Sequence, residues 1–311
     1  MRKGAALAAA LAVSLSSAAR AGDVDLTLER LIGPPPMAGA APVVGNATRS
    51  AYAGLVSELG VALSPRALQP ADSLGWSGFA ASFDASFTQV SRDADYWRLG
   101  ARNLTTTVLP LVGATIRKGL WLGAPSLELS LGGHRLIGSD MATLEVGAKL
   151  AIHEGFHGWA IPSIAVRVAV AHLFGSPQVA LTVLEAGVLV SKRFAVRGAL
   201  QLDPFVGLGA LVVFSSSQVI DTTPEVDAYR QKPLGAPDEN ANVTLPDLDP
   251  LPRLRVHGGL RLKVSLFQLT VEGAFVPCNG TGRDCQHDGA VAVVDRSGGQ
   301  AQASLSLGVV Y

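Results

Sequence analysis

The sequence predicts an all-β fold, a transmembrane antiparallel up-and-down β-barrel of about ten strands, with twelve strands as the alternative. Three observations predict it. Apolar and polar residues alternate with period two along most of the chain after residue 75, which indicates strands with two different faces. Short connections between these segments alternate with long ones. Aromatic residues gather near the segment ends, where a membrane has its interfaces.

The last segment has the clearest alternation. From Gln300 to Tyr311 the odd positions are apolar, and the even positions are small or polar except for Val310. A strand of this kind that ends in an aromatic residue resembles the closing strand of bacterial outer-membrane β-barrel proteins. The phrases 191–194 (SKRF) and 204–209 (PFVGLG) also resemble such families, in this case ones without an assigned activity. The resemblance implies an outer-membrane location, with outer-membrane lipid and the barrel-assembly machinery as partners.

Residues 1–21 have the pattern of a cleaved secretory signal peptide. Arg2 and Lys3 precede a short apolar run, and the sequence Ala-Arg-Ala at 19–21 provides a small-x-small cleavage site. The mature chain is therefore expected to begin near Gly22. A retained N-terminal helix is the alternative.

Residues 22–75 are expected to form a periplasmic linker that contains one short helix. Three consecutive prolines and an Ala/Gly-rich stretch at 33–45 cannot pack a core. The apolar spacing in 50–63 favours a helix, with Ser50 as its N-cap and Pro65 as its stop, although a strand fits the same residues. We expect this helix to pack under or into the periplasmic mouth of the barrel, which occupies 76–311.

Within the barrel, neighbouring strands alternate in direction, so the expected periplasmic position of Tyr311 orients all of them. The short connections at 118–119, 154–158, 192–193 and 265–266 then lie in the periplasm, and the long connections 91–103, 215–252 and 278–299 lie outside. This distribution is typical of bacterial barrels. The expected strands are 76–90, 104–117, 120–132, 141–153, 159–173, 178–191, 195–214, 253–264, 267–277 and 300–311.

The polar phase of the strands predicts which charged residues face the lumen. A charge on the lipid face would cost about 2–4 kcal/mol at the membrane midplane, so the charges are expected inside. Six acidic and six basic residues qualify, which indicates a narrow lumen of mixed charge. They are Asp84, Glu128, Glu145, Lys149, Arg167, Glu185, Arg197, Asp203, Arg255, Arg261, Lys263 and Glu272.

Basic residues follow one another along the inward face of 253–264, and two interpretations of them stay open. In one, they belong to a structural salt-bridge lattice inside a barrel narrow enough for side chains to fill. In the other, they line a path for a small anionic solute, because rings of Arg and Lys select anions. These residues, called the basic column below, are Arg253, Arg255, His257, Arg261 and Lys263.

Two further features concern the ends of the barrel. An aromatic girdle is expected at the periplasmic interface, because amphipathic rings settle at headgroup level. Cys278 and Cys285 are the only cysteines, and they enclose six residues of an external loop. In an oxidising compartment this spacing favours a local disulfide. The residues of the expected girdle are Trp76, Trp121, Trp159, Phe267 and Tyr311.

The sequence limits the functional classes less sharply than the fold. A net charge of zero leaves no basic footprint for nucleic acid. The His-Glu-x-x-His match at 153–157 is interpreted as a periplasmic turn, because Gly155 and Gly158 interrupt any helix that could hold zinc. No metal or cofactor is expected. The leading hypothesis is a structural barrel or small-solute channel, the next is a surface barrel that binds partners through long loops, and a barrel enzyme (protease or lipid-modifying hydrolase) is disfavoured.

Overall fold

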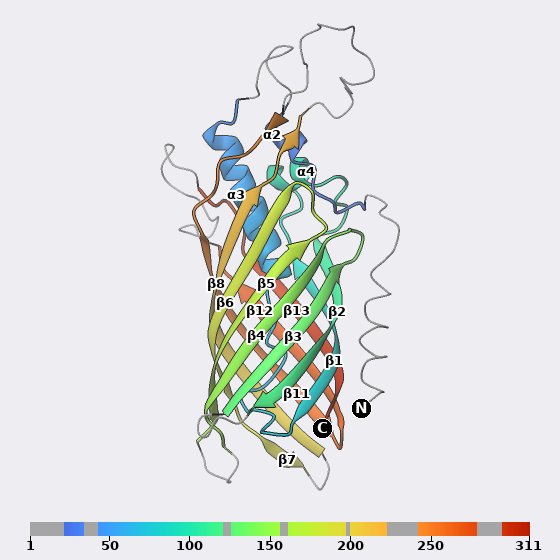
Figure 1. The fold of residues 1–311 in the computed structure, drawn as a ribbon, viewed down its shortest axis with the longest axis vertical. Helices are drawn as coiled ribbons and strands as arrows, with labels where there is room; N and C mark the ends of the chain where they lie inside the picture. Colours follow the sequence, from blue (N-terminus) through green and yellow to red (C-terminus); the bar gives the residue numbers. More distant parts are fainter. Residues whose placement is uncertain are drawn as a thin grey trace, which may run out of the picture.

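In the computed structural model, ten antiparallel strands close into a barrel (Figure 1). The structure describes residues 22–33, 43–120, 126–155, 161–196, 200–222, 242–278 and 294–311. The barrel strands are β1 (Phe79–Gln89), β2 (Val108–Leu120), β3 (Ser126–Leu136), β4 (Ala142–His153), β5 (Ser163–Phe174), β6 (Val179–Ser191), β8 (Leu200–Ser217), β11 (Leu251–Val264), β12 (Phe267–Val276) and β13 (Gln300–Val310).

The barrel closes where its last strand meets its first. The last strand β13 pairs with the first strand β1, from Ala80 opposite Val310 to Thr88 opposite Gln302. Strand β8 pairs with β11 across the long connection 218–250. The prediction of an all-β barrel is confirmed, with ten strands and not twelve. The short strand β7 (Phe194–Val196) pairs only with β8 beyond the rim, and β9 (Ile220–Asp221) and β10 (Asn242–Val243) form a separate pair.

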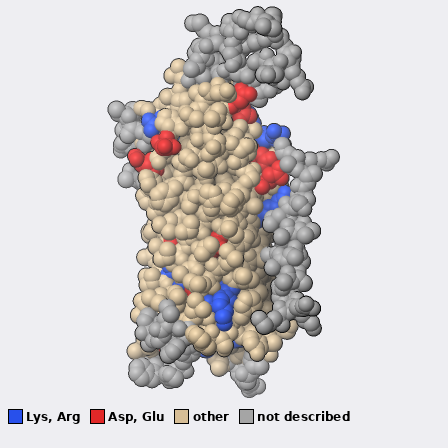
Figure 2. Space-filling model, viewed as in Figure 1, with Lys and Arg blue, Asp and Glu red and all other residues tan. Residues whose placement is uncertain are grey.

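The outer wall is apolar because each strand alternates between lipid and lumen. In β1 the exposed and buried positions follow one another along the strand, with Phe83 73% exposed and Asp84 buried beside it. In Figure 2 the barrel wall is mostly free of charge, and most of the charged side chains in view lie toward the upper end. A closed sheet with an apolar belt outside satisfies every strand's backbone and meets lipid on all sides. The chain is therefore a membrane-spanning barrel of the bacterial outer-membrane type.

The two rims differ in the length of their connections, which orients the barrel in the membrane. At the Tyr311 rim, β11 and β12 join through Ser265 and Leu266 alone. The long connections 90–107, 218–250 and 277–299 begin and end at the opposite rim. Short turns mark the periplasmic side and long loops the external side. The lower rim in Figure 1, where the C-terminus lies, is accordingly the periplasmic rim.

One predicted turn is wrong. Lys118 and Gly119 belong to β2, where they pair with Leu129 and Glu128 of β3. The lysine is tolerated at the strand end because its ammonium reaches the carbonyl oxygens of Trp76 and Gly78, at 3.2 and 3.3 Å. The turn itself falls in 121–125, outside the described residues.

The aromatic residues predicted for the periplasmic girdle that the structure describes are all exposed at that rim. Trp76 precedes β1, Phe267 begins β12 and Tyr311 follows β13, and all three side chains are exposed. Phe194 of β7 is exposed beside them. The two remaining girdle residues, Trp121 and Trp159, lie outside the described part of the chain.

The structure corrects the prediction of a periplasmic linker. Helix α3 (Asn46–Leu63) lies inside the external mouth, at the end opposite to Tyr311 (Figure 1). Residues 22–32, which include helix α2 (Leu28–Ile32), lie at the same end, where Leu26 pairs with Ala101 beside helix α4 (Asp95–Gly100). No helix in the described ranges is long and apolar enough to cross a membrane.

Helix α3 is buried on every side along most of its length, as expected of a helix inside the barrel. Leu55, Val56 and Leu59 are fully buried in one cluster with inward side chains of the upper strands, such as Leu211 and Val213 of β8. Only the apolar stripe of this helix was visible in the sequence, and a single stripe fits a helix that lies under a rim. A helix that also buries its polar face needs polar partners on the other side, and the external loops supply them.

The outward face of the strands can be tested at the middle of β5. Val168→Arg places a cation on a side chain that is 44% exposed toward lipid, and it should lower the free energy of unfolding by about 2–4 kcal/mol. Denaturant unfolding in lipid vesicles measures the loss, with Val168→Ala as the control for the lost side-chain volume. Equal stability of the two variants would contradict the lipid-facing position.

Candidate functional site

The lumen is occupied by the chain itself. After α3 ends, residues 64–74, called the lumen segment below, continue through the barrel toward the periplasmic rim, where the chain turns into β1. All but Leu74 are buried, including Arg66, Gln69 and Asp72. The lumen segment has neither helical nor strand pairing of its own, so its peptide groups need partners from the wall.

Basic side chains of the wall bind the carbonyl oxygens of the lumen segment. Arg255 Nη1 donates to the carbonyl of Pro65 at 2.7 Å, and Arg167 Nη2 donates to that of Arg66 at 3.0 Å. Lower down, Lys149 Nζ donates to the carbonyls of Pro70 and Asp72, at 3.1 and 2.8 Å. Three strands, β11, β5 and β4, therefore hold the segment from different sides.

Acceptor side chains around the wall bind its N–H groups. The backbone nitrogen of Leu68, whose φ of 44° is left-handed, donates to Glu272 of β12 at 2.9 Å. The other donors are Ala71 to Ser191 Oγ at 3.0 Å, Ser73 to Glu154 at 2.8 Å and Leu74 to Glu128 at 3.2 Å. Glu154, part of the His-Glu-x-x-His match, thus serves as a hydrogen-bond acceptor at the periplasmic rim.

The same charged residues pair with one another at the level of the upper lumen segment. Arg167 lies between Glu145, at 2.8 Å, and Glu185. Glu185 also accepts a hydrogen bond from Arg255. All four side chains are buried. Two arginines and two glutamates thus form one chain of ion pairs, and each arginine still has a donor left for the lumen segment.

A second group of ion pairs lies near the periplasmic rim. Glu128 is 3.4 Å from both Arg117 and Lys149. Both cations also donate to Gln69 Oε1 of the lumen segment, at 2.7 and 3.2 Å. The side chain of Gln69 therefore completes a cluster that the wall begins.

The remaining charged residues predicted for the lumen are also placed inside, with two exceptions. Arg261 binds Asp203 through Nε at 2.8 Å and Nη2 at 2.5 Å. Glu272 lies 3.4 Å from His257, and Asp84 lies 3.6 Å from His134. Lys263 is only half-buried, near the periplasmic rim, and Arg197 lies outside the described residues.

At the external mouth, Glu58 of α3 joins the helix to two loops. Its carboxylate is fully buried and accepts hydrogen bonds from Tyr96 Oη and Trp97 Nε1, each at 2.7 Å. The backbone nitrogens of Ser91 and Gly298 also donate to it, each at 2.8 Å. Burial and the adjacent carboxylate raise the pKa of Tyr96 above its ordinary value, so the phenol stays protonated and remains a donor.

The top of the basic column is held in the same way. Arg253 donates to Ser57 Oγ at 2.9 Å and to Ser297 Oγ. It also donates to the carbonyl oxygens of Pro277 and Gly298, at 3.0 and 2.9 Å. The guanidinium group thus fastens α3 to the loop before β13.

Sequence reasoning missed the residues that belong to the plug and one that belongs to the wall. Arg66, Gln69 and Asp72 fell in the expected linker, and nothing in their local pattern marks them as buried. Arg117 fell at the end of an expected strand. Arg117 alternates with Thr115 and Gly113, which lie opposite inward residues of β1. This period of two is the signal that could have placed Arg117 in the lumen.

The expected disulfide stays a prediction. Cys278 lies just beyond β12 at the external end, whereas Cys285 lies outside the described residues.

Glu185 accepts hydrogen bonds from both Arg167 and Arg255. Its substitution therefore tests the salt-bridge lattice of the lumen. Glu185→Gln keeps the side-chain shape but leaves two buried guanidinium groups with less negative charge, so it should destabilise the barrel by about 3–5 kcal/mol. The matched control is Asp93→Asn, which removes an exposed 3.1 Å pair with Arg92 and should cost less than about 1 kcal/mol. Denaturant unfolding measures both, and equal losses would contradict the lattice.

Comparison with protein-family models and with curated proteins finds no match. Among solved structures, the barrel is similar to Neisserial surface protein A, with 13% identity over 75% of this chain and 95% of that chain and a TM-score of 0.30. It is also similar to the translocator domain of the autotransporter NalP from Neisseria meningitidis (12%, 77% and 89%, 0.38) and to the transport unit of AIDA-I from Escherichia coli (9%, 85% and 98%, 0.34). Similarity this low assigns neither family nor activity, and the membrane-spanning assignment rests on the closed sheet and its apolar wall.

Proposed function

We propose that the protein is a closed outer-membrane barrel, a structural element of that membrane that presents a folded external rim and conducts no solute at rest. The observation that carries the proposal is the lumen segment, whose carbonyl and N–H groups are both bonded to the wall. Helix α3 fills the external mouth above it. The proposed role requires no catalytic residue and no cofactor, and it needs only lipid and the assembly machinery as partners.

The arrangement of the basic column supports a closed barrel over an anion path. An anion path needs cations that face open solvent. Arg255 is paired with Glu185, and Arg261 is paired with Asp203. Arg253 is fully buried among hydroxyl and carbonyl oxygens. The charges of Arg255 and Arg261 are thus compensated by carboxylates, and Arg253 does not face open solvent, so little attraction remains for a solute anion.

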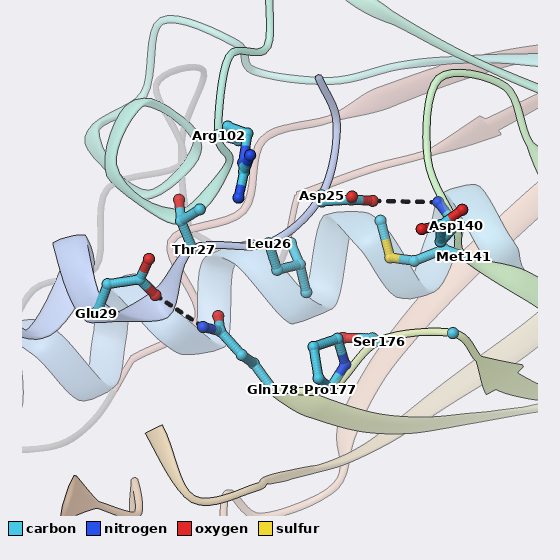
Figure 3. Close-up of a pocket in the computed structure, with 11 residues that line it drawn as sticks. Asp25, Leu26, Thr27, Glu29, Arg102, Asp140, Met141, Ser176, Pro177 and Gln178 are labelled. Carbon is cyan, nitrogen blue, oxygen red and sulfur yellow. Dashed lines mark hydrogen bonds between the residues drawn. The ribbon is translucent and has the colours of Figure 1, made fainter. Parts of the chain in front are cut away.

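A second candidate is a surface barrel that binds a partner at the external rim. The observation in its favour is a cavity of about 350 Å³ between residues 25–29 and the turns after β3 and β5 (Figure 3). Asp25, Glu29 and Asp140 give this cavity an acidic lining, with Arg102 as its one basic residue. A cationic or hydrogen-bonding partner would suit it.

Conductance separates a closed barrel from a channel. The refolded protein in planar lipid bilayers should show no stable single-channel steps, and deletion of residues 46–74 should produce them because the lumen is then vacated. Steady anion-selective currents from the unaltered protein, lost in Arg261→Glu, would contradict the closed barrel.

A point substitution tests the same closure without removing a segment. Glu58→Ala leaves four donors at the external mouth without their acceptor, and it should make brief openings frequent because α3 is then poorly anchored. Thr48→Ala on the same helix is the control and should show no channel openings. Single-channel recording measures both variants, and a silent Glu58→Ala barrel of normal fold would show that this carboxylate does not hold the plug in place.

A further inference from the structure

The backbone nitrogen of Gly22 lies at the external rim, beside the carboxylate of Asp25. It donates to Asp25 Oδ2 at 2.5 Å. The other oxygen, Asp25 Oδ1, accepts from Ser139 Oγ at 2.6 Å. As Figure 3 shows, it also accepts from the backbone nitrogen of Asp140, at 3.2 Å. The carboxylate therefore joins the start of the described chain to the turn between β3 and β4.

The fit around Gly22 excludes a larger residue. A Cβ atom at this position would lie 2.1 Å from the carbonyl oxygen of Gly138. That carbonyl already accepts a hydrogen bond from the backbone nitrogen of Val24 at 3.2 Å. On the other side, the nitrogens of Arg102 and Asn103 donate to the carbonyls of Asp25 and Asp23, each at 2.9 Å. Residues 22–25 are thus held between two external loops.

Among the residues that the structure describes, none forms a salt bridge with Asp25. In the described part of the chain, the three hydrogen-bond donors to its carboxylate are two backbone nitrogens and one hydroxyl, all uncharged. Asp140 next to it has its own cation, because Arg135 lies 3.5 Å away. A positive charge on the nitrogen of Gly22 would supply what Asp25 lacks, since charge-assisted hydrogen bonds are about twice as strong as neutral ones.

We propose that a signal peptidase cuts between Ala21 and Gly22, and that the new α-ammonium group of Gly22 docks on Asp25 at the external rim. In this hydrolysis the amide bond breaks and water is consumed. Ala21 receives the hydroxyl and becomes a carboxylate, and the nitrogen of Gly22 receives protons and becomes the ammonium. The small-x-small sequence at 19–21 is the cleavage site that the proposal requires.

The proposal also fixes the path of the chain. Residues 22–28 lie at the external end of the barrel, where Thr27 bonds to Gly100 and Leu28 bonds to Gln178. The lumen segment reaches the periplasmic rim before β1 begins. The mature N-terminus is therefore displayed at the cell surface, and the chain between it and β1 passes through the barrel. The surface position of the N-terminus follows from the orientation of the barrel, whether or not the lumen conducts.

The first test is the mass of the intact protein extracted from outer membranes. The expected chain begins at Gly22. A chain that begins at any other residue would overturn the proposal, because the ammonium would then lie elsewhere.

The second test measures the effect of the positive charge on the nitrogen of Gly22 separately from the close packing around this residue. The mature chain can be refolded from a form that starts at Gly22 and from one with an additional alanine before Gly22, which turns the ammonium back into an amide. Hydrogen exchange of the Asp140 amide measures how firmly Asp25 is held. The extension should speed this exchange about tenfold, the effect of losing one charge-assisted hydrogen bond.

Matched variants complete the comparison. Asp25→Asn should speed the exchange as the extension does, and the two changes together should add little to either alone. Asp23→Asn, at an exposed neighbouring carboxylate, should change nothing. An extension without effect on a chain that responds to Asp25→Asn, or two effects that simply add, would overturn the ammonium docking.

Discussion

The structure depends on one constraint, which is that a peptide chain inside a barrel must find a hydrogen-bond partner for each buried peptide group. A strand of the wall meets this need through its neighbours, but residues 64–74 have no neighbouring strand. Side chains of the wall take that role instead. Arg255, Arg167 and Lys149 serve the carbonyl oxygens, and Glu272 and Glu128 serve the N–H groups. The lumen therefore carries both signs of charge: cations bind the carbonyl oxygens, and carboxylates bind the N–H groups.

The ion pairs of the wall have a second role in this arrangement. A buried charge without a partner is costly, and the three cations that serve the lumen segment, Arg255, Arg167 and Lys149, are each paired with a glutamate. Arg167 between Glu145 and Glu185 is the clearest case. These ion pairs come from strands β4, β5, β6 and β11, whereas the lumen segment is also bonded to Glu272 of β12 and Glu128 of β3, which lie on either side of the seam between β13 and β1. We infer that the plug is fixed in place only once the wall is complete.

The parts of this fold that alternation controls could be predicted from the sequence. The ten strands, and the inward position of residues such as Asp84 and Glu185, follow from a period of two between lipid and lumen. The plug could not be predicted, because its partners are far apart in the chain: Leu68 and Glu272 are separated by 204 residues. A short stretch that contains two prolines and has its hydrogen bonds met by side chains has no periodic signal. It therefore resembled a linker, and α3 was placed at the wrong mouth.

Amide hydrogen exchange within the lumen segment tests the central claim most directly. If the wall satisfies the peptide groups of this segment, the amides of Leu68, Ala71 and Leu74 should exchange slowly in the folded barrel, at rates close to those of the barrel strands. Exchange of these three amides at the rate of an unstructured peptide, while the strand amides stay protected, would contradict the account.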